Sequence, residues 1–287
     1  MEYLTRIPID YGWSGDKKWR VTGENGRQYL LRVSPLARAE DRARMAALQR
    51  QAWALGVPTC ESLEFGLCAG GVYLLQRWVD GVDAREALPG LDPAQQRGLG
   101  QEAGRLLKLL HTIPAPSDLP AWETRCRAKT EKNLASYFAC PVRFSEDAAL
   151  IRVVGDGLPL LSGRPQCFQH GDYHVGNMML EQGKLVILDF DRWGYGDPWA
   201  EFKRIVWCAE LSPAFASGMV DAYFDGDVPD AFWALLRFYL SQGALGSIPW
   251  AIPYGQGEVD TMLRQADELL CWYDGMERLV PGWYEKA

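Results

Sequence analysis

The sequence predicts an α+β fold with two lobes, a small β-rich N-lobe and a larger, mainly helical C-lobe. Three observations support this prediction. The first third of the chain alternates strand-forming segments with turn residues, the remainder carries apolar residues at helical spacing, and one pair of strands interrupts the helical part. We place the boundary after residue 79, which gives lobes at 1–79 and 80–287. The cleft between two such lobes is a common ligand site.

The N-lobe is predicted to hold strands around one helix. The expected strands lie at 17–23 and 27–35, with a further pair within 60–79. Asn25-Gly26 separates the first two strands and is a strong hairpin signal. Residues 39–55 predict a helix that ends before Gly56 and Pro58.

The C-lobe is predicted to be mainly helical. Asp92-Pro93 is a typical helix start, and the leucines that follow keep helical spacing as far as His111. Asp197-Pro198 has the same form and is expected to cap another helix. Further helices are expected at 121–139, 146–161, 197–210, 212–223, 229–245 and 257–276. A strand pair within 177–190 is expected to turn at 181–184.

Composition limits the compartment and the partners. The seven cysteines form no CxxC pair and their odd count leaves any full disulfide scheme incomplete, so we expect a reduced, cytoplasmic protein. No apolar run approaches the roughly 20 residues that span a bilayer, so no membrane partner is expected. We also expect the protein to act as a monomer.

The net charge of −7 is unevenly distributed. From Gly163 onward, 18 acidic residues stand against 9 basic ones, a balance of −9, whereas the residues before it have a balance of +2. No basic face suited to nucleic acid is evident. The acidic half indicates a cationic partner, although a solvated acidic surface would give the same counts.

Two polar motifs stand out, "QHGDYHVGNMML" at 169–180 and "KLVILDFDRWG" at 184–194. His170, Asp172 and His174 alternate, so an extended backbone would project them from one face, as a metal cage requires. The chain has three histidines in all, so a fourth ligand would have to be a cysteine or a carboxylate from elsewhere.

Two other interpretations of these motifs compete with the metal cage. A polar turn between strands explains Gly171 and Gly176, but not the charged and amide groups that gather beside an apolar strand. A phosphoryl-transfer site uses more of the residues. Such a site needs a carboxylate near the attacking hydroxyl and oxygen ligands for divalent cations, which an Asp, an Asn five residues later and a second Asp on a neighbouring strand can supply.

"HGDYHVGN" resembles the HxDxxxxN catalytic loop of the aminoglycoside phosphotransferase and choline kinase superfamily, which has a protein-kinase-like fold. "ILDFDRWGYGDPWAEF" is similar to the metal-binding segment of that superfamily and the helix after it. The resemblance also includes the N-terminal hairpin, "GVPTC", the hinge "LLQRWVDG" and "LLKLLHTIPAP", and so spans nearly the whole chain.

The resemblance implies roles for the residues of the two motifs. Asp172 would be the catalytic base that orients or deprotonates the acceptor hydroxyl. Asn177 and Asp189 would hold Mg²⁺. His170 would shape the loop by hydrogen bonding, and His174 would either touch the substrate or pack.

Asp191 lies where protein kinases have the glycine of their metal-binding triplet, so we assign it an auxiliary role. Only a short segment separates Asp189 from the next helix. This leaves no room for the long activation segment of a protein kinase, and a small-molecule kinase is expected instead.

A nucleotide site is predicted in the N-lobe. Strand alternation places Leu30 and Arg32 on one face, where Leu30 could cover the purine and Arg32 could reach the phosphates. The turn "YGWSGDKKW" would cover the phosphates and supply Ser14. In the hinge, Gln76 and Trp78 are expected to line the site.

One position departs from the pattern that the resemblance implies. The helix after Arg32 should offer a glutamate to pair with it, but counting back from "GVP" leads to Met45. Asp41, one turn earlier, or Glu40 could take its place, or the ion pair could be absent.

These observations predict a Mg²⁺-dependent kinase that transfers the γ-phosphoryl group of ATP or GTP to a hydroxyl of a cationic antibiotic, with an aminoglycoside as first choice. A metabolic kinase of an amino alcohol, amino sugar or related metabolite is the alternative. A nucleotide-binding pseudokinase would keep the fold, but the intact set of Asp172, Asn177 and Asp189 disfavours it.

Overall fold

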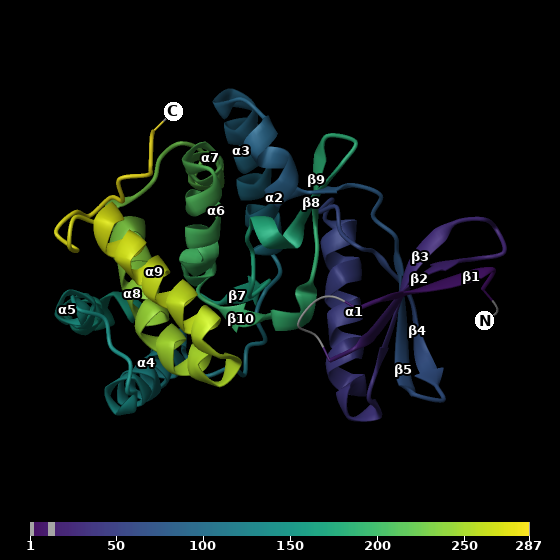
Figure 1. The fold of residues 1–287 in the computed structure, drawn as a ribbon, viewed down its shortest axis with the longest axis horizontal. Helices are drawn as coiled ribbons and strands as arrows, with labels where there is room; N and C mark the ends of the chain where they lie inside the picture. Colours follow the sequence, from purple (N-terminus) through teal and green to yellow (C-terminus); the bar gives the residue numbers. More distant parts are fainter. Residues whose placement is uncertain (1–2, 11–14, 287) are drawn as a thin grey trace. The chain divides into compact units, whose positions relative to one another are not determined.

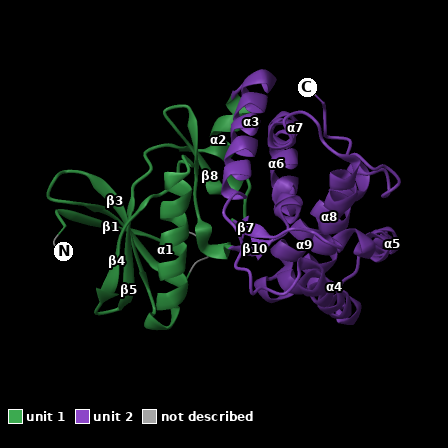
Figure 2. Ribbon diagram, turned by 180° about the vertical axis from the view of Figure 1, so that it is seen from behind, with its two compact units in different colours: residues 1–90, 170–193 green, residues 91–169, 194–287 purple. Residues whose placement is uncertain are grey.

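The computed structural model describes residues 3–10 and 15–286 of the chain (Figure 1). Two compact units are present (Figure 2). Unit 1 comprises residues 1–90 and 170–193, and unit 2 comprises residues 91–169 and 194–287. A β-rich N-terminal part is followed by a helical part, so the predicted α+β class is confirmed. The lobe boundary after residue 79 stays a prediction.

Unit 1 is built on a five-stranded antiparallel sheet with the order β1-β2-β3-β5-β4. Its strands are β1 Thr5–Ile9, β2 Lys17–Thr22, β3 Gln28–Ser34, β4 Ser62–Cys68 and β5 Gly71–Arg77. Four of these were predicted to within about two residues. No residue range was predicted for β1. It lies at the edge of the sheet, where the proline of "TRIPI" needs no ladder donor.

The two faces of β3 differ as its alternation predicted. Leu31 packs with Val21 and Leu75 in a buried cluster on one face. On the other face, Arg32 and its neighbours meet α1 (Ala39–Ala54), whose Gln49 Oε1 accepts a hydrogen bond of 2.8 Å from Gln76 Nε2. The helix therefore covers the face that carries the predicted nucleotide residues.

A second, three-stranded sheet in unit 1 has the order β6-β8-β9. Its strands are β6 Val82–Asp83, β8 Met178–Glu181 and β9 Lys184–Ile187. The hairpin of β8 and β9 matches the predicted pair and its turn. Arg77, at the end of β5, forms a 2.8 Å ion pair with Glu181 and so ties this hairpin to the first sheet.

Short helices complete unit 1, and unit 2 is mainly helical. The short helices of unit 1 include η1 Leu36–Arg38, α2 Ala84–Ala87 and the 3-10 turn η2 Leu88–Gly90. The α-helices of unit 2 are α3 Pro93–Leu110, α4 Trp122–Ala139, α5 Asp147–Gly157, α6 Ile205–Leu211, α7 Pro213–Tyr223, α8 Asp230–Ala251 and α9 Gln256–Trp272. Its 3-10 helices include η3 Leu158–Leu161, η6 Pro198–Arg204 and η7 Ile252–Tyr254. Within residues 3–10 and 15–286, no helix combines the length and the apolar composition needed to cross a bilayer.

The predicted helices all exist, with several differences in extent. The helix expected at 146–161 is α-helical to Gly157 and continues as the 3-10 helix η3, and the helix expected at 257–276 ends at Trp272. The helix expected at 197–210 begins as the 3-10 helix η6 and becomes α-helical only at Ile205. α8 continues past the expected end at residue 245, through Pro249 to Ala251. Unit 2 also holds a small unpredicted strand pair, β7 Cys167–Gln169 and β10 Gly194–Gly196, in which Gln169 is opposite Gly194.

The packing of α3 on α7 depends on glycine. A Cβ atom at Gly100 would lie 2.0 Å from the carbonyl oxygen of Phe215, and one at Gly104 would lie 2.2 Å from that of Met219. The two helices therefore approach backbone to backbone, and no larger residue fits at either position without moving them.

Asp197 is a buried centre of hydrogen bonds in unit 2. Its carboxylate accepts two bonds of 2.7 Å from Arg164 and one of 2.7 Å from the Tyr239 hydroxyl. It also accepts from the backbone N–H of Trp199 at 3.0 Å, which is the predicted helix cap. Because a buried carboxylate is stable only when it is paired, Arg164 is essential to this arrangement.

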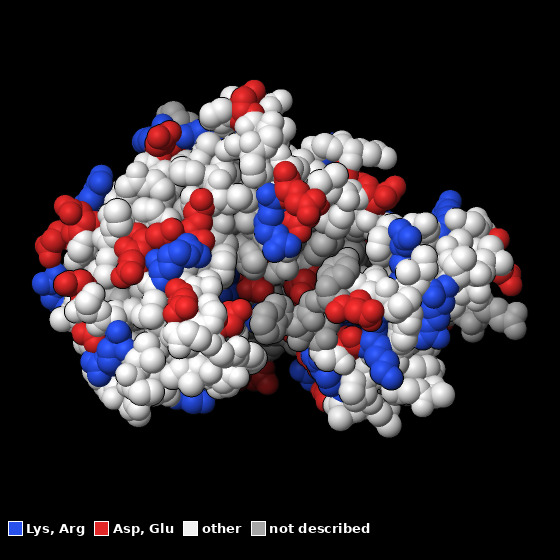
Figure 3. Space-filling model, in the orientation of Figure 1, with Lys and Arg blue, Asp and Glu red and all other residues white. Residues whose placement is uncertain are grey.

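Charged side chains of both signs are mixed on the surface. Figure 3 shows Asp and Glu side chains interspersed with Lys and Arg side chains over the face in view. Many of these charges are paired at short range, such as Arg152 with Glu277 at 2.7 Å and Lys108 with Asp225 at 2.5 Å.

A carboxylate pair lies between α6 and α9. Glu210 Oε1 is buried and has no hydrogen-bond partner among the described residues, while Arg264 Nη2 is 3.6 Å from Glu210 Oε2. Burial, followed by the neighbouring Glu268, raises the pKa of Glu210 to about 7 from a usual value of 4.5.

Glu210→Gln should remove a pH-dependent loss of stability. A carboxyl whose pKa is raised in the folded state favours folding when it is protonated, so this contribution is lost as the pH rises from about 4.5 to about 7. The variant should unfold at a higher temperature than the wild type at pH 8 and at nearly the same temperature at pH 5. Thermal unfolding at both pH values measures this, with Asp267→Asn, at an exposed position of helix α9 next to Glu268, as control. An equal difference at both pH values would contradict the assignment.

Candidate functional site

The first polar motif forms a loop between β7 and β8, closed by the 3-10 turn η4 Val175–Asn177. Gly171 adopts φ +84°, and a Cβ atom there would lie 1.9 Å from the carbonyl oxygen of Arg192. The loop thus touches the second polar motif directly, through a position that only glycine can occupy. We call residues 170–177 the loop and residues 189–193 the DFDRW segment.

His170 joins the loop to the strand end before the DFDRW segment. Its ring is fully buried and packs edge-on against Phe190 at 4.8 Å. Nδ1 accepts the backbone N–H of Asp172 at 3.3 Å, so Nε2 carries the proton and donates it to the carbonyl of Leu188 at 2.7 Å. Both nitrogens are therefore used, and His170 has neither a free base nor a free metal-ligating atom.

The peptide of Leu188 brings the two motifs together. Its N–H donates to the carbonyl of Asn177 at 2.8 Å, which extends the β8-β9 ladder by one step. Asp189 follows Leu188 directly, one residue beyond this bond. Asn177 Nδ2 in turn donates to the carbonyl of Asp172 at 2.9 Å and to its Oδ2 at 3.2 Å. Asp172 and Asn177 are thus bonded to each other, and Asp189 is joined to them through the Leu188 peptide.

Asp189 has a strained backbone. Its φ and ψ are 55° and 73°, in the left-handed region that a non-glycine residue seldom adopts. Its Oδ1 accepts the N–H of Asp191 at 3.2 Å, so the carboxylate caps the short 3-10 turn η5 (Phe190–Arg192). Strain of this kind persists only where surrounding contacts enforce it.

Asp172 is half-buried and has basic neighbours. His174 Nε2 is 3.7 Å from Oδ1, and Arg192 Nε is 3.8 Å from Oδ2. His174 Nδ1 accepts the N–H of Gly176 at 3.1 Å, so its protonated nitrogen faces Asp172. His174 therefore supports the loop from within.

The donor atoms suit Mg²⁺ better than a transition metal. Since Asn177 Nδ2 is turned toward Asp172, the amide oxygen is the atom that can coordinate, and Asp189 adds a carboxylate. No group of three or more His, Cys, Asp or Glu within the described part of the chain is arranged to hold a metal. The interpretation of His170, Asp172 and His174 as a metal cage is wrong, because both ring nitrogens of His170 are hydrogen-bonded to the backbone.

Arg32 is buried between two carboxylates. Its Nη2 donates to Asp16 Oδ2 at 2.8 Å and to Asp191 Oδ2 at 2.5 Å. Ser34 Oγ donates to the other oxygen of Asp16 at 2.7 Å. Burial alone would raise the pKa of Asp16, but the Ser34 hydroxyl and the nearby arginines, Arg32 among them, lower it below the usual value.

The partners of Arg32 differ from the alternatives that the sequence offered. Asp41 pairs with Arg38 at 3.0 Å, and Glu40 pairs with Arg44 at 2.6 Å. Both acidic residues lie on the outward side of α1, whereas Met45 is fully buried. The carboxylates that hold Arg32 come instead from Asp16 and Asp191, far from α1 in the sequence.

The remaining nucleotide residues occupy the expected strands. Leu30 is opposite Gln76 in the β3-β5 register. The Gln76 side chain is buried and bonded to α1, and Trp78 lies under the Arg20 guanidinium, 5.5 Å from the ring centre. Ser14 lies outside the described residues. The nucleotide contacts of these residues stay predictions.

Sequence reasoning missed two residues of this group, Asp16 and Arg42. Asp16 lies within the predicted phosphate-covering turn "YGWSGDKKW", and that position was its one signal in the sequence. Arg42 lies on α1 one turn before Met45, and it contacts both Asp16 and Asp191.

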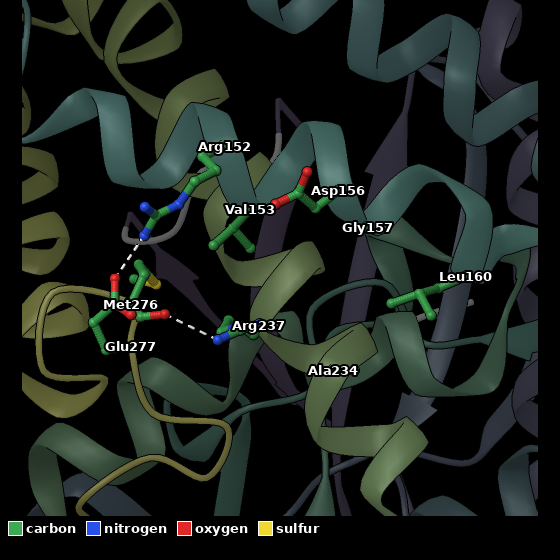
Figure 4. Close-up of a pocket in the computed structure, with 9 residues that line it drawn as sticks. All are labelled: Arg152, Val153, Asp156, Gly157, Leu160, Ala234, Arg237, Met276 and Glu277. Carbon is green, nitrogen blue, oxygen red and sulfur yellow. Dashed lines mark hydrogen bonds and ion pairs between the residues drawn. The ribbon is translucent and has the colours of Figure 1, made fainter.

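A cavity of about 340 Å³ lies in unit 2 (Figure 4). It contains none of the predicted site residues and is lined by Arg152, Val153, Asp156, Gly157, Leu160, Ala234, Arg237, Met276 and Glu277. Its arginines are already engaged, Arg152 with Glu277 at 2.7 Å and Arg237 with the carbonyl of Met276 at 2.9 Å. We assign it no ligand.

Known structures share this fold. Aminoglycoside 2'-phosphotransferase-IIIa in complex with GDP aligns with a TM-score of 0.71 at 13% identity, covering 96% of this chain and 94% of the other. A choline/ethanolamine kinase family protein from Mesorhizobium loti gives 0.68 at 17% identity, covering 96% and 92%. Aminoglycoside phosphotransferase APH(4)-Ia with ADP and hygromycin B gives 0.66 at 16% identity, covering 94% of each.

Sequence comparisons identify the family. A glucosamine kinase from Streptacidiphilus jiangxiensis is 30% identical over 195 residues, which is 61% of this chain and 43% of that protein. The chain thus spans less than half the length of this curated relative. Residues 5–237 match the phosphotransferase enzyme family. The chain belongs to the phosphotransferase enzyme family.

Proposed function

We propose that this phosphotransferase moves the γ-phosphoryl group of ATP or GTP to a hydroxyl of a small acceptor that carries amino groups. The observation that carries the proposal is the hydrogen bonding between Asp172 and Asn177, with Asp189 joined to them through the Leu188 peptide. A loop carboxylate beside an amide and a second carboxylate is the arrangement that phosphoryl transfer requires.

In this mechanism Asp172 receives the acceptor hydroxyl. The hydroxyl oxygen forms a bond to the γ-phosphorus, the bond between that phosphorus and the bridging oxygen breaks, and the nucleoside diphosphate leaves. The proton of the hydroxyl passes to Asp172. Asn177 keeps Asp172 in place through its amide N–H groups, so that the carboxylate is oriented before the acceptor arrives.

Asn177 Oδ1 and the Asp189 carboxylate are the atoms that would hold Mg²⁺. Mg²⁺ held there would supply positive charge that stabilises the charge developing on the transferred phosphoryl group. Arg32 is the cation proposed to reach the phosphates, and Leu30 and Trp78 are proposed to contact the purine. Arg32 would exchange part of its bonding to Asp16 and Asp191 for phosphate oxygens.

The proposed acceptor is an amino sugar, either as part of an aminoglycoside or free. An aminoglycoside is our first choice, since the chain carries a charge of −9 after Gly163, and acidic surfaces concentrate cations. A free amino sugar is the second candidate, favoured by the 30% identity to a glucosamine kinase. Both offer hydroxyl groups beside ammonium groups, so the same kind of pocket could accept either.

A diphosphate-release assay separates these acceptors. It would be run with ATP and then GTP against aminoglycosides, glucosamine, choline, homoserine, and the neutral analogue glucose. Turnover with aminoglycosides but not with glucosamine supports the first choice, and the reverse result supports the second. Turnover confined to glucose or another neutral acceptor would refute the cationic acceptor. No turnover with any of them, despite nucleotide binding, would favour a pseudokinase.

Asp172→Asn should leave nucleotide binding nearly unchanged and lower kcat by about 10²-fold or more, because a positioned base is lost while the shape of the loop is kept. Turnover and the nucleotide Kd of the variant measure the two effects separately. Turnover within about 3-fold of the wild type would remove Asp172 from the base role.

Asp189→Ala should weaken Mg²⁺-dependent nucleotide binding more than Asp191→Ala does. Asp189 follows the strand end that Asn177 and His170 hold, whereas the Asp191 carboxylate is already paired with Arg32. A Mg²⁺ titration of nucleotide binding with each variant decides the order. A larger loss for Asp191→Ala would show that Asp191, and not Asp189, is the metal ligand.

A further inference from the structure

Arg42 completes a buried cluster of alternating charges in unit 1. Its Nη1 is 2.5 Å from Asp191 Oδ1, while Arg32 Nη2 is 2.5 Å from Asp191 Oδ2. On the other side, Arg42 Nη2 is 2.7 Å from Asp16 Oδ2, and Arg32 Nη2 is 2.8 Å from the same oxygen. Two arginines and two aspartates thus form a closed ring in which each arginine contacts both aspartates.

The Asp191 carboxylate is held from two directions, one arginine on each oxygen. A carboxylate with both oxygens bound cannot rotate freely, so the position of Asp191 is fixed. The Asp191 N–H donates to Asp189 Oδ1 at 3.2 Å, and Asp189 needs support because of its left-handed backbone. A continuous path of contacts therefore leads from Arg42 through Asp191 to Asp189.

Both arginines are buried, with 8% of the Arg32 side chain and 2% of the Arg42 side chain exposed, but only Arg32 is proposed to bind nucleotide. In the proposed function Arg32 turns toward the donor phosphates, which weakens its hold on Asp191. Arg42 is fixed by the Ser34 hydroxyl, which accepts from its Nε at 3.1 Å. Arg42 is thus the partner that can keep Asp191 in place while Arg32 binds nucleotide.

We propose that Arg42 is a positioning residue that fixes the metal-binding carboxylate of Asp189 through Asp191. This role rests on the proposed function, because it assumes that Asp189 holds Mg²⁺. It also accounts for Met45, which stands where the resemblance implies a glutamate that pairs with Arg32. The helix supplies a cation in place of the expected acid, and the acidic partners come from the DFDRW segment and from Asp16.

Arg42→Lys tests the proposal with little change in volume or charge. Lysine is a point charge and cannot make the separate contacts of a guanidinium with two carboxylates. Loss of a residue that orients a metal ligand typically costs 10–100-fold in metal affinity. We therefore expect the Mg²⁺ concentration for half-maximal nucleotide binding to rise by at least about 10-fold, with nucleotide affinity restored at saturating Mg²⁺.

Arg44→Lys is the matched control. Arg44 lies on the same helix, 65% of its side chain is exposed, and it pairs only locally with Glu40. It should leave the Mg²⁺ requirement unchanged. Asp191→Asn removes the same contact without altering α1. The double variant with Arg42→Lys should need no more Mg²⁺ than Asp191→Asn alone. Wild-type Mg²⁺ dependence in Arg42→Lys, or additive effects in the double variant, would overturn the proposal.

A readout without metal or nucleotide separates this proposal from the proposed function. Amide hydrogen exchange at Asp191 in the metal-free protein should be faster in Arg42→Lys than in the wild type and unchanged in Arg44→Lys. If the wild type binds no Mg²⁺-nucleotide, the proposed function fails while this measurement still tests the contact path. Unchanged exchange at Asp191 in Arg42→Lys would refute the path itself.

Discussion

The peptide group of Leu188 is hydrogen-bonded on both sides, to His170 through its carbonyl and to Asn177 through its N–H. These two bonds fix the end of β9 against the loop. Asp172 lies within reach of the Asn177 amide, and Asp189 follows Leu188 directly. The buried His170 ring acts here as a spacer with a fixed tautomer, because its other nitrogen is occupied by the Asp172 N–H.

The second constraint is electrostatic. Each arginine that is buried on the helix-facing side of β3 must find a carboxylate, because an unpaired buried charge costs several kcal/mol. Arg32 and Arg42 together are neutralised by Asp16 and Asp191. Sequence-distant segments are thereby joined in unit 1: the strand β3, the helix α1, the start of β2 and the DFDRW segment. The same contacts that balance the charges also order the segment that carries Asp189.

Sequence patterns predicted the elements that depend on local signals. The Asn25-Gly26 hairpin, the alternation in β3 and the spacing of Asp172 and Asn177 all have direct counterparts in the structure. No residue range was predicted for the edge strand β1, and its Pro8 is compatible with a strand at that edge position. The end of α8 was placed too early, at residue 245, whereas the helix continues through Pro249 to Ala251.

The charge cluster could not be predicted in the same way. Asp41 and Arg42 lie four and three residues before Met45. At 3.6 residues per turn, either of them can lie on the same side of the helix as Met45. Which of them turns inward depends on the partners that the rest of the fold supplies. Asp41 has a neighbouring Arg38 on the outside, whereas Arg42 meets Asp16 and Asp191, whose positions no local pattern reveals.

The short ladder between β7 and β10 has a consequence for the residues between them. Gln169 and Gly194 are opposite each other, so the chain leaves unit 2 and returns to it at one point. Residues 170–193 are therefore a closed loop whose ends are already joined, and closing a loop removes much of the conformational entropy that its internal contacts must overcome. The order of the segment that carries Asp172, Asn177 and Asp189 is in this sense set partly at its base, by three residue pairs that include none of these residues.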